Sequence, residues 1–169
     1  RDLREVVGSM GLTLLNVVPT EKLYDPHFNQ IMEICETHAA AGFEGAMAKE
    51  AESSYSFKKS SNMLKVKLFS EADLRVKGFY EGKGRLKGTL GGLIVGGTIE
   101  WSPPKSGKPL KKYAVKSKVG SGFDDATRDE IWNNKDDWSS AIVQIKFQEA
   151  TDKGSLRFPV FVMRRRDKE

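Results

Sequence analysis

From about residue 64 onward, apolar and polar positions alternate in short runs that predict β-strands. The runs are separated by clusters of Gly, Pro, Asp or Lys. Within 141–147, every second residue from Ala141 to Phe147 is apolar, and Gln144 and Lys146 lie between them. This period of two is typical of a strand with one buried face. The predicted strands are residues 64–68, 74–80, 89–95, 113–119, 141–147 and 156–163.

The first 50 residues have a different pattern, with an apolar run of strand length at residues 12–18 followed by a helical period. Asp25 and Pro26 predict the start of that helix, because Asp accepts hydrogen bonds from free amides and Pro suits the first helical position. Apolar residues then recur at helical spacing up to Gly42, which predicts the end of the helix. Cys35 lies on the apolar side and is expected in the core.

A second helix interrupts the strands. Asp124 or Asp125 caps a segment that continues to about Asn134, and Ile131 and Trp132 are expected to plug one end of the sheet. Five short strands with one helix, and without βαβ alternation, predict a small closed β-barrel of the oligonucleotide-binding (OB) kind. We therefore expect an α+β chain of two domains, residues 1–73 and residues 74–169.

Charge is distributed unevenly along the 169 residues, whose formal net charge is +5. Residues 1–50 hold 4 basic and 8 acidic residues, residues 51–120 hold 15 and 5, and residues 121–169 hold 9 and 10. The basic middle with its aromatic residues suits contact with phosphates of a nucleotide or nucleic acid, although a solvated lysine-rich surface has the same composition.

Two loops within this basic region permit both a structural and a phosphate-binding interpretation. Residues 82–88, GKGRLKG, have spaced glycines and cations but no following helix, which favours a basic hairpin turn over a nucleotide cradle. Residues 102–109, SPPKSGKP, are a loop between strands that either is simply flexible or contacts a nucleic-acid backbone.

The cysteine content and the hydropathy of the sequence indicate the cellular compartment in which the protein is expected. A single cysteine cannot form an internal disulfide, which fits a reducing compartment. No apolar run approaches the roughly 18 residues of a membrane span, and no stretch has the pattern of a signal peptide. We expect a cytoplasmic or nucleoid-associated protein, or one in the host cytoplasm if it is viral, without a membrane partner.

Three short motifs occur together in a fixed order. The first is EGAMAK at residues 44–49, the second is LKVK at residues 64–67, and the third is SLRFPVFVMRRRDK at residues 155–168. In the second motif, strand geometry places Lys65 and Lys67 on one face. Each motif alone is ordinary, but the three in this order and spacing are far less expected by chance.

With these motifs the sequence resembles the ATP-dependent DNA ligases, which belong to the lysine-adenylylating nucleotidyltransferases. The three motifs are similar to that family's fourth, fifth and sixth motifs, and VGSGFDDATR at residues 119–128 is similar to a stretch of the ligase OB domain. The resemblance covers essentially the whole chain. It implies the C-terminal part of an ATP-grasp-like adenylation domain followed by a five-stranded OB-fold barrel with one helix.

The resemblance also implies roles for residues of the fourth and fifth motifs. Glu44 would bind the divalent metal, Mg²⁺. Lys49 and Lys59 would approach ATP, and Lys65 and Lys67 would contact its α-phosphate. These residue types suit phosphoryl transfer, because fixed cations and a metal stabilise the negative charge that develops on the phosphoryl oxygens.

The sixth motif supplies the remaining site residues. By resemblance, Arg165, Asp167 and Lys168 orient the pyrophosphate leaving group when the terminal domain closes over ATP. They lie far along the chain from the fifth motif, so we expect a hinge near residues 72–74. Arg164 and Arg166 have no assigned role. The expected catalytic residues are Lys65, Lys67 and Arg165.

One part of the family pattern is missing. The family's covalent chemistry begins at a lysine in a K-x-[DH]-G motif, and none of the lysines here lies in such a motif. We therefore expect the chain to be the C-terminal part of a ligase, unable by itself to form the lysine–AMP adduct, with the N-terminal remainder of the adenylation domain as a partner.

The expected function of the whole enzyme is the sealing of 5′-phosphate/3′-hydroxyl nicks in duplex DNA through lysine–AMP and DNA–adenylate intermediates, by a monomer. Two alternatives stay open. An RNA-capping guanylyltransferase has the same architecture, although the long sixth motif favours a ligase. A non-catalytic nucleic-acid-binding module of the OB type is the alternative from a different class.

Overall fold

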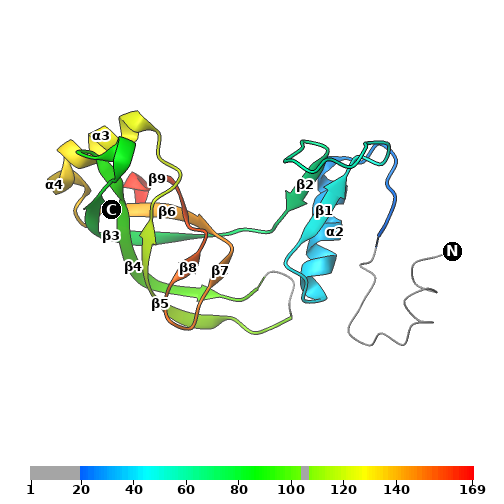
Figure 1. Ribbon diagram of the computed structural model, residues 1–169. Helices are drawn as coiled ribbons and strands as arrows, with labels where there is room; N and C mark the ends of the chain where they lie inside the picture. Colours follow the sequence, from blue (N-terminus) through cyan, green and yellow to red (C-terminus); the bar gives the residue numbers. More distant parts are fainter. Residues whose placement is uncertain (1–19, 104–106) are drawn as a thin grey trace.

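The computed structural model describes residues 20–103 and 107–169. The strand predicted at residues 12–18 lies outside the described residues. Two groups of elements are connected by a single extended segment (Figure 1). The smaller group contains a helix and two short strands, and the larger contains a five-stranded sheet with its helices.

The smaller group consists of helix α2, Phe28–Ala40, and the antiparallel strands β1, Ala46–Lys49, and β2, Met63–Val66. The helix was expected to start at Asp25 and Pro26, and this was wrong. Asp25 has a φ of +46°, and His27 occupies the N-cap position without a side-chain cap. The end is as predicted, because Gly42 follows with a φ of +91° and its N–H donates to the Ala39 carbonyl.

The larger group is built on a fully antiparallel sheet with the strand order β5-β4-β3-β6-β9. The edge strands β5 and β9 approach each other at one parallel bridge between Ser121 and Val160. The five-stranded OB-fold prediction is confirmed, but the expected closure of the barrel was wrong, because β5 and β9 are not joined by a ladder and only this isolated bridge connects the two edges. The strands are β3, Ser70–Glu81; β4, Leu90–Trp101; β5, Lys111–Val119; β6, Ile142–Phe147; and β9, Val160–Arg164.

Several predicted strands change length or divide. β4 continues through Gly96 and Gly97 to Trp101, well beyond the predicted end at residue 95. The strand predicted at residues 156–163 is two strands, because Phe158 has a φ of +49° and Pro159 has no N–H for a ladder. Its first part, β8, Leu156–Arg157, pairs with β7, Glu149–Ala150.

The predicted second helix is present as α3, Asp125–Asn133, and a short helix α4, Lys135–Trp138, follows it. Asp124 caps α3 by accepting a hydrogen bond from the Thr127 N–H at 2.7 Å. Ile131 is fully buried and Trp132 packs against the core, in agreement with the prediction that these two residues cover one end of the sheet. The glycine-rich segment 82–88 is the turn between β3 and β4, so the hairpin interpretation is correct.

The hydrophobic core lies within the larger group. Its members come from all five strands, both helices and the β7–β8 pair, and they include Leu74, Val95, Val119 and Val143. Cys35 is buried separately between α2 and the small ladder, where its Sγ donates to the Val66 carbonyl. Within the described residues, no helix is long and apolar enough to cross a membrane.

Candidate functional site

The ladder of β1 and β2 presents two of the predicted lysines on one face. Lys65 lies opposite Met47 and Lys49 lies opposite Met63, and cross-strand partners share a face. All four residues are exposed. The opposite face carries Ala46, Ala48 and Val66, which are half-buried on the side of Cys35 and α2. Lys49 and Lys65 are thus displayed together on the open face.

Glu44 connects the two lysines of the fifth motif. Its carboxylate lies 3.3 Å from the Lys65 Nζ and 3.4 Å from the Lys67 Nζ. The hydrogen bond from Lys65, together with the charges of both lysines, lowers the pKa of the Glu44 carboxyl below its usual value. The fourth and fifth motifs therefore meet in one charged cluster. Lys59 lies exposed in the irregular segment between the strands.

Lys67 is held more tightly than Lys65, because residues of the larger group also contact it. Its Nζ donates to the Gln148 Oε1 at 3.1 Å and lies 5.2 Å from the centre of the Phe158 ring. Its side chain is only 14% exposed, against 57% for Lys65. Sequence reasoning missed Gln148 and Phe158. The positive φ of Phe158, an exposed residue in a strained conformation, is a feature that the sequence does not reveal.

The predicted residues of the sixth motif form a second cluster. Arg165 donates from its Nε and Nη2 to the Asp167 carboxylate at 2.9 and 2.7 Å. Its Nη1 lies 3.3 Å from both carboxylate oxygens of Asp73, and the Lys168 Nζ also contacts Asp73. The interaction with Arg165 lowers the pKa of the Asp167 carboxyl to about 2. Asp73 was not predicted as a site residue.

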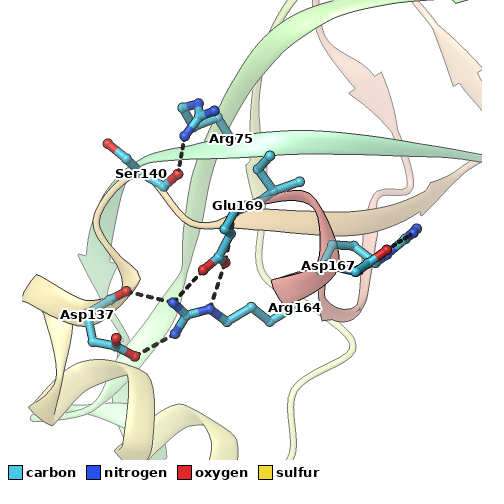
Figure 2. Close-up of polar contacts among 8 residues, drawn as sticks. Arg75, Asp137, Ser140, Arg164, Asp167 and Glu169 are labelled. Atoms are coloured by element: carbon cyan, nitrogen blue, oxygen red, sulfur yellow. Dashed lines mark hydrogen bonds and ion pairs between the residues drawn. The ribbon is translucent and has the colours of Figure 1, made fainter.

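Arg164, which had no assigned role, has a structural one. Figure 2 shows its guanidinium between the carboxylates of Asp137 and Glu169. It also lies 5.0 Å from the centre of the Trp138 ring, and its side chain is 12% exposed. These contacts fix the last strand against α4. They separate Arg164 from Arg165, although the two are adjacent in the sequence.

A third cationic feature, which we call the lysine strip, lies on the outer face of the barrel. It consists of Lys77 on β3 and of Lys116 and Lys118 on β5, all of them exposed. Gly96 of β4 lies opposite Lys116 in the ladder, and a Cβ there would lie 3.2 Å from the Lys77 Cγ. The strip therefore crosses a buried glycine, and the absence of a side chain there leaves room for the Lys77 stem.

Metal binding was predicted at Glu44. Among residues 20–103 and 107–169, no group of three or more His, Cys, Asp or Glu side chains could by itself hold a metal ion. An exposed single carboxylate still fits Mg²⁺, which retains several waters and commonly takes one or two protein carboxylates together with substrate phosphates. The ion pairs of Glu44 with two lysines also suit a place where phosphate and metal come together.

Comparison with known proteins decides the family. A family model described as DNA ligase OB-like domain matches residues 81–165, half of the chain. The chain belongs to this DNA ligase family. The match covers the barrel from the end of β3 to the sixth-motif arginine, and it favours the expected ligase over the guanylyltransferase alternative. No curated protein sequence matches the chain.

Solved structures agree with this assignment. The structure named Pmar-Lig_Pre. is 31% identical over 82% of this DNA ligase chain, with a TM-score of 0.68, and the chain covers 30% of it. A structure from "Structure-function analysis of Lig E DNA ligases", which concerns DNA binding with a minimal scaffold, is 27% identical over 86% of the chain, with a TM-score of 0.62. The chain covers 49% of that structure, so it spans less than half the length of either relative.

Proposed function

We propose that this chain is the C-terminal part of an ATP-dependent DNA ligase that seals nicks in duplex DNA. The whole enzyme transfers AMP from ATP to a lysine and then to the 5′-phosphate of the nick, after which the 3′-hydroxyl displaces AMP. Residues 1–73 are the proposed end of the adenylation domain and residues 74–169 the proposed OB domain. β3 already starts at Ser70, so the last residues of the first segment are built into the barrel sheet.

The open face of the small ladder is the proposed nucleotide side. Lys49 and Lys65 project from it, and Lys67 lies beside them through Glu44. Lysine ammonium groups at fixed positions stabilise the charge on phosphoryl oxygens during in-line transfer. In this role Lys65 and Lys67 contact the α-phosphate, while Lys49 and Lys59 contact other parts of ATP. Glu44 holds the Mg²⁺, whose chemistry is to neutralise the phosphate oxygens.

Arg165 and Lys168 are proposed to hold the pyrophosphate during lysine adenylylation, with Asp167 orienting the Arg165 guanidinium. Both cations belong to the barrel, and Lys65 belongs to the other group of elements. A domain movement must therefore bring them together. Residues 72–74 pair regularly with residues 143–145, whereas residues 67–69 belong to no strand. We therefore propose the hinge in residues 67–69, in place of the residues 72–74 expected from the sequence.

DNA binding is proposed for the lysine strip. The arrangement of its three lysines is the main support for the proposed function. Lys116 and Lys118 project from the same face of β5, and the Lys77 stem lies over Gly96 beside them. OB folds bind oligonucleotides on the face of their second and third strands, which here are β4 and β5. Lysines on that face can each contact one backbone phosphate of nicked duplex DNA, which supplies affinity without reading sequence.

The test is the salt dependence of binding between the purified chain and a fluorescent nicked duplex, measured by anisotropy at several salt concentrations. Each phosphate contact that is lost should reduce the slope of log K against log salt by about 0.9. We therefore expect K116Q and K118Q each to weaken binding and to flatten the slope by about one unit.

Lys112 provides the matched control. It lies on the same strand and face as Lys116, but its Nζ is 3.5 Å from the Glu100 carboxylate, which neutralises its charge. K112Q should change neither affinity nor slope appreciably. Equal effects of K112Q and K116Q would show that only net charge matters, and a slope unaffected by all three substitutions would refute the proposed surface.

A further inference from the structure

Asp73 is the one carboxylate that contacts both sixth-motif cations, Arg165 and Lys168, in the described residues. It lies near the start of β3, opposite Gln144 of β6, and the chain separation between Asp73 and Arg165 is 92 residues. The two cations come from the end of the barrel and converge on this single carboxylate from the same turn.

The geometry of the contact resembles the way a phosphate is bound. The Arg165 Nη1 lies at equal distances of 3.3 Å from the two oxygens of Asp73, and Lys168 contacts one of them. The rest of the Arg165 fork is taken up by Asp167. One guanidinium nitrogen and one lysine ammonium that converge on a carboxylate can equally hold a single phosphate group.

The environment makes this contact more than a mobile surface pair. The side chains of Asp73 and Arg165 are each 23% exposed, so water and salt screen them only in part. Asp73 and Asp167 together match the two positive charges of Arg165 and Lys168. The cluster is therefore neutral as it stands, and an incoming anion gains little from Arg165 and Lys168 while Asp73 stays in place.

We propose that Asp73 is a positioning residue that holds Arg165 and Lys168 as a preformed anion site and occupies that site until a polyphosphate displaces it. The inference rests on the proposed function, in which these two cations bind the pyrophosphate part of ATP. Asp73 then sets the affinity of the sixth motif for phosphate. It keeps the two cations aligned, and it also competes directly with the ligand.

The experiment is an NMR titration of the chain with inorganic tripolyphosphate, observing the Nε–Hε signal of Arg165. This signal is specific to the site, so binding of tripolyphosphate to the lysine strip does not interfere. D73N removes the competing charge and keeps the shape of the side chain. We therefore expect the affinity for tripolyphosphate, measured at Arg165, to rise between about three- and tenfold, which corresponds to the loss of one or two partly screened ion pairs.

Glu71 gives a matched control. It lies two residues earlier on the same strand, and its carboxylate accepts from the Gln144 amide rather than from a cation of the sixth motif. E71Q removes the same charge from the chain and should leave the affinity at Arg165 unchanged. Circular dichroism and thermal unfolding of both variants establish that each is folded.

The outcomes separate the inference from the proposed function. Equal affinity of the wild-type chain, D73N and E71Q at Arg165 would overturn the role of Asp73 and leave phosphate binding by the sixth motif intact. No response of Arg165 in any of the three would overturn both. If D73N fails to fold, the wild-type titration tests the proposal. Displacement of Asp73 by tripolyphosphate requires the NMR signals of the Asp73 carboxyl and of Arg165 to shift together, with one dissociation constant.

Discussion

Removing the Arg128 guanidinium should destabilise the barrel strongly. Arg128 on α3 is 7% exposed, and it donates to the Leu90, Gly91 and Gly120 carbonyls at 2.8, 3.1 and 2.9 Å. It also lies 5.1 Å from the centre of the Phe123 ring. These contacts fasten α3 to the start of β4 and to the residue that follows β5. R128M keeps most of the volume and removes every donor.

The size of the effect follows from the three carbonyls. A hydrogen bond from a charged donor contributes about 1.5 to 3 kcal/mol, but water can reach the part-buried carbonyls of Gly91 and Gly120 once the donor is gone. We therefore take about 1 kcal/mol for each bond, which gives a loss of about 3 kcal/mol in the free energy of unfolding. For a chain of this size, that loss lowers the melting temperature by about 6 to 12 °C.

Urea unfolding followed by tryptophan fluorescence measures this loss. All three tryptophans, Trp101, Trp132 and Trp138, lie in the larger group of elements, so the signal reports the barrel alone. The matched control is R85M. Arg85 forms an equally good fork with Asp125, at 2.8 and 3.2 Å, but its side chain is 74% exposed.

An exposed pair of this kind contributes about 0 to 1 kcal/mol. R128M should therefore cost several times more than R85M. If the two variants lose the same stability, or if R128M loses less than about 1 kcal/mol, then the buried carbonyls do not depend on Arg128 and the reasoning is refuted.

Two further predictions concern the backbone and pH. Gly154 has a φ of +77°, and a Cβ there would lie 2.3 Å from the Ala114 carbonyl oxygen, so G154A should destabilise by about 2 to 4 kcal/mol in urea unfolding. Gly84, with a φ of +59° and open space around it, is the control, and G84A should cost only about 1 to 2 kcal/mol; equal losses would contradict the predicted clash. The lowered pKa of Asp167 means that its contribution to stability is present above its ordinary value of 3.8 and is lost as pH falls toward about 2. A carboxyl NMR titration should place the Asp167 midpoint near 2 in the wild-type chain and closer to 3.8 in R165Q, and an identical midpoint in both would rule out Arg165 as the cause.

The sheet was predictable where alternation is regular, and less so where glycine or proline interrupts it. Residues 141–147 alternate cleanly, and β6 occupies almost the predicted range. The end of β4 was placed too early, because Gly96 and Gly97 suggest a turn. In the structure they continue the strand, since Gly96 lies opposite Lys116 and beneath the Lys77 stem. Pro159, by contrast, was a clear signal for a break between β8 and β9 that the alternation alone concealed.

Charged contacts between distant parts of the chain were the least predictable feature. The resemblance assigned Glu44 and Lys65 to one nucleotide site without pairing them, and the structure has the two in contact. Nothing in the sequence connects Lys67 with Gln148, or Asp73 with Arg165, because each pair is brought together only by the folding of the sheet. The one available clue for Asp73 was that it is an acidic residue within the strongly basic middle of the chain.

The run of Arg164, Arg165 and Arg166 shows what strand geometry adds to composition. Arg164 is the last residue of β9, whereas Arg165 lies just outside the strand and leads into the turn at residues 166–168, so the two adjacent arginines have different environments. Arg164 packs on the Trp138 side with Asp137 and Glu169, and Arg165 binds Asp73. A basic cluster identified by composition alone therefore overstates the number of cations available to a phosphate. In this chain, the end of β9 at Arg164 gives that arginine a structural role and leaves Arg165, in the following turn, as the one placed to bind an anion.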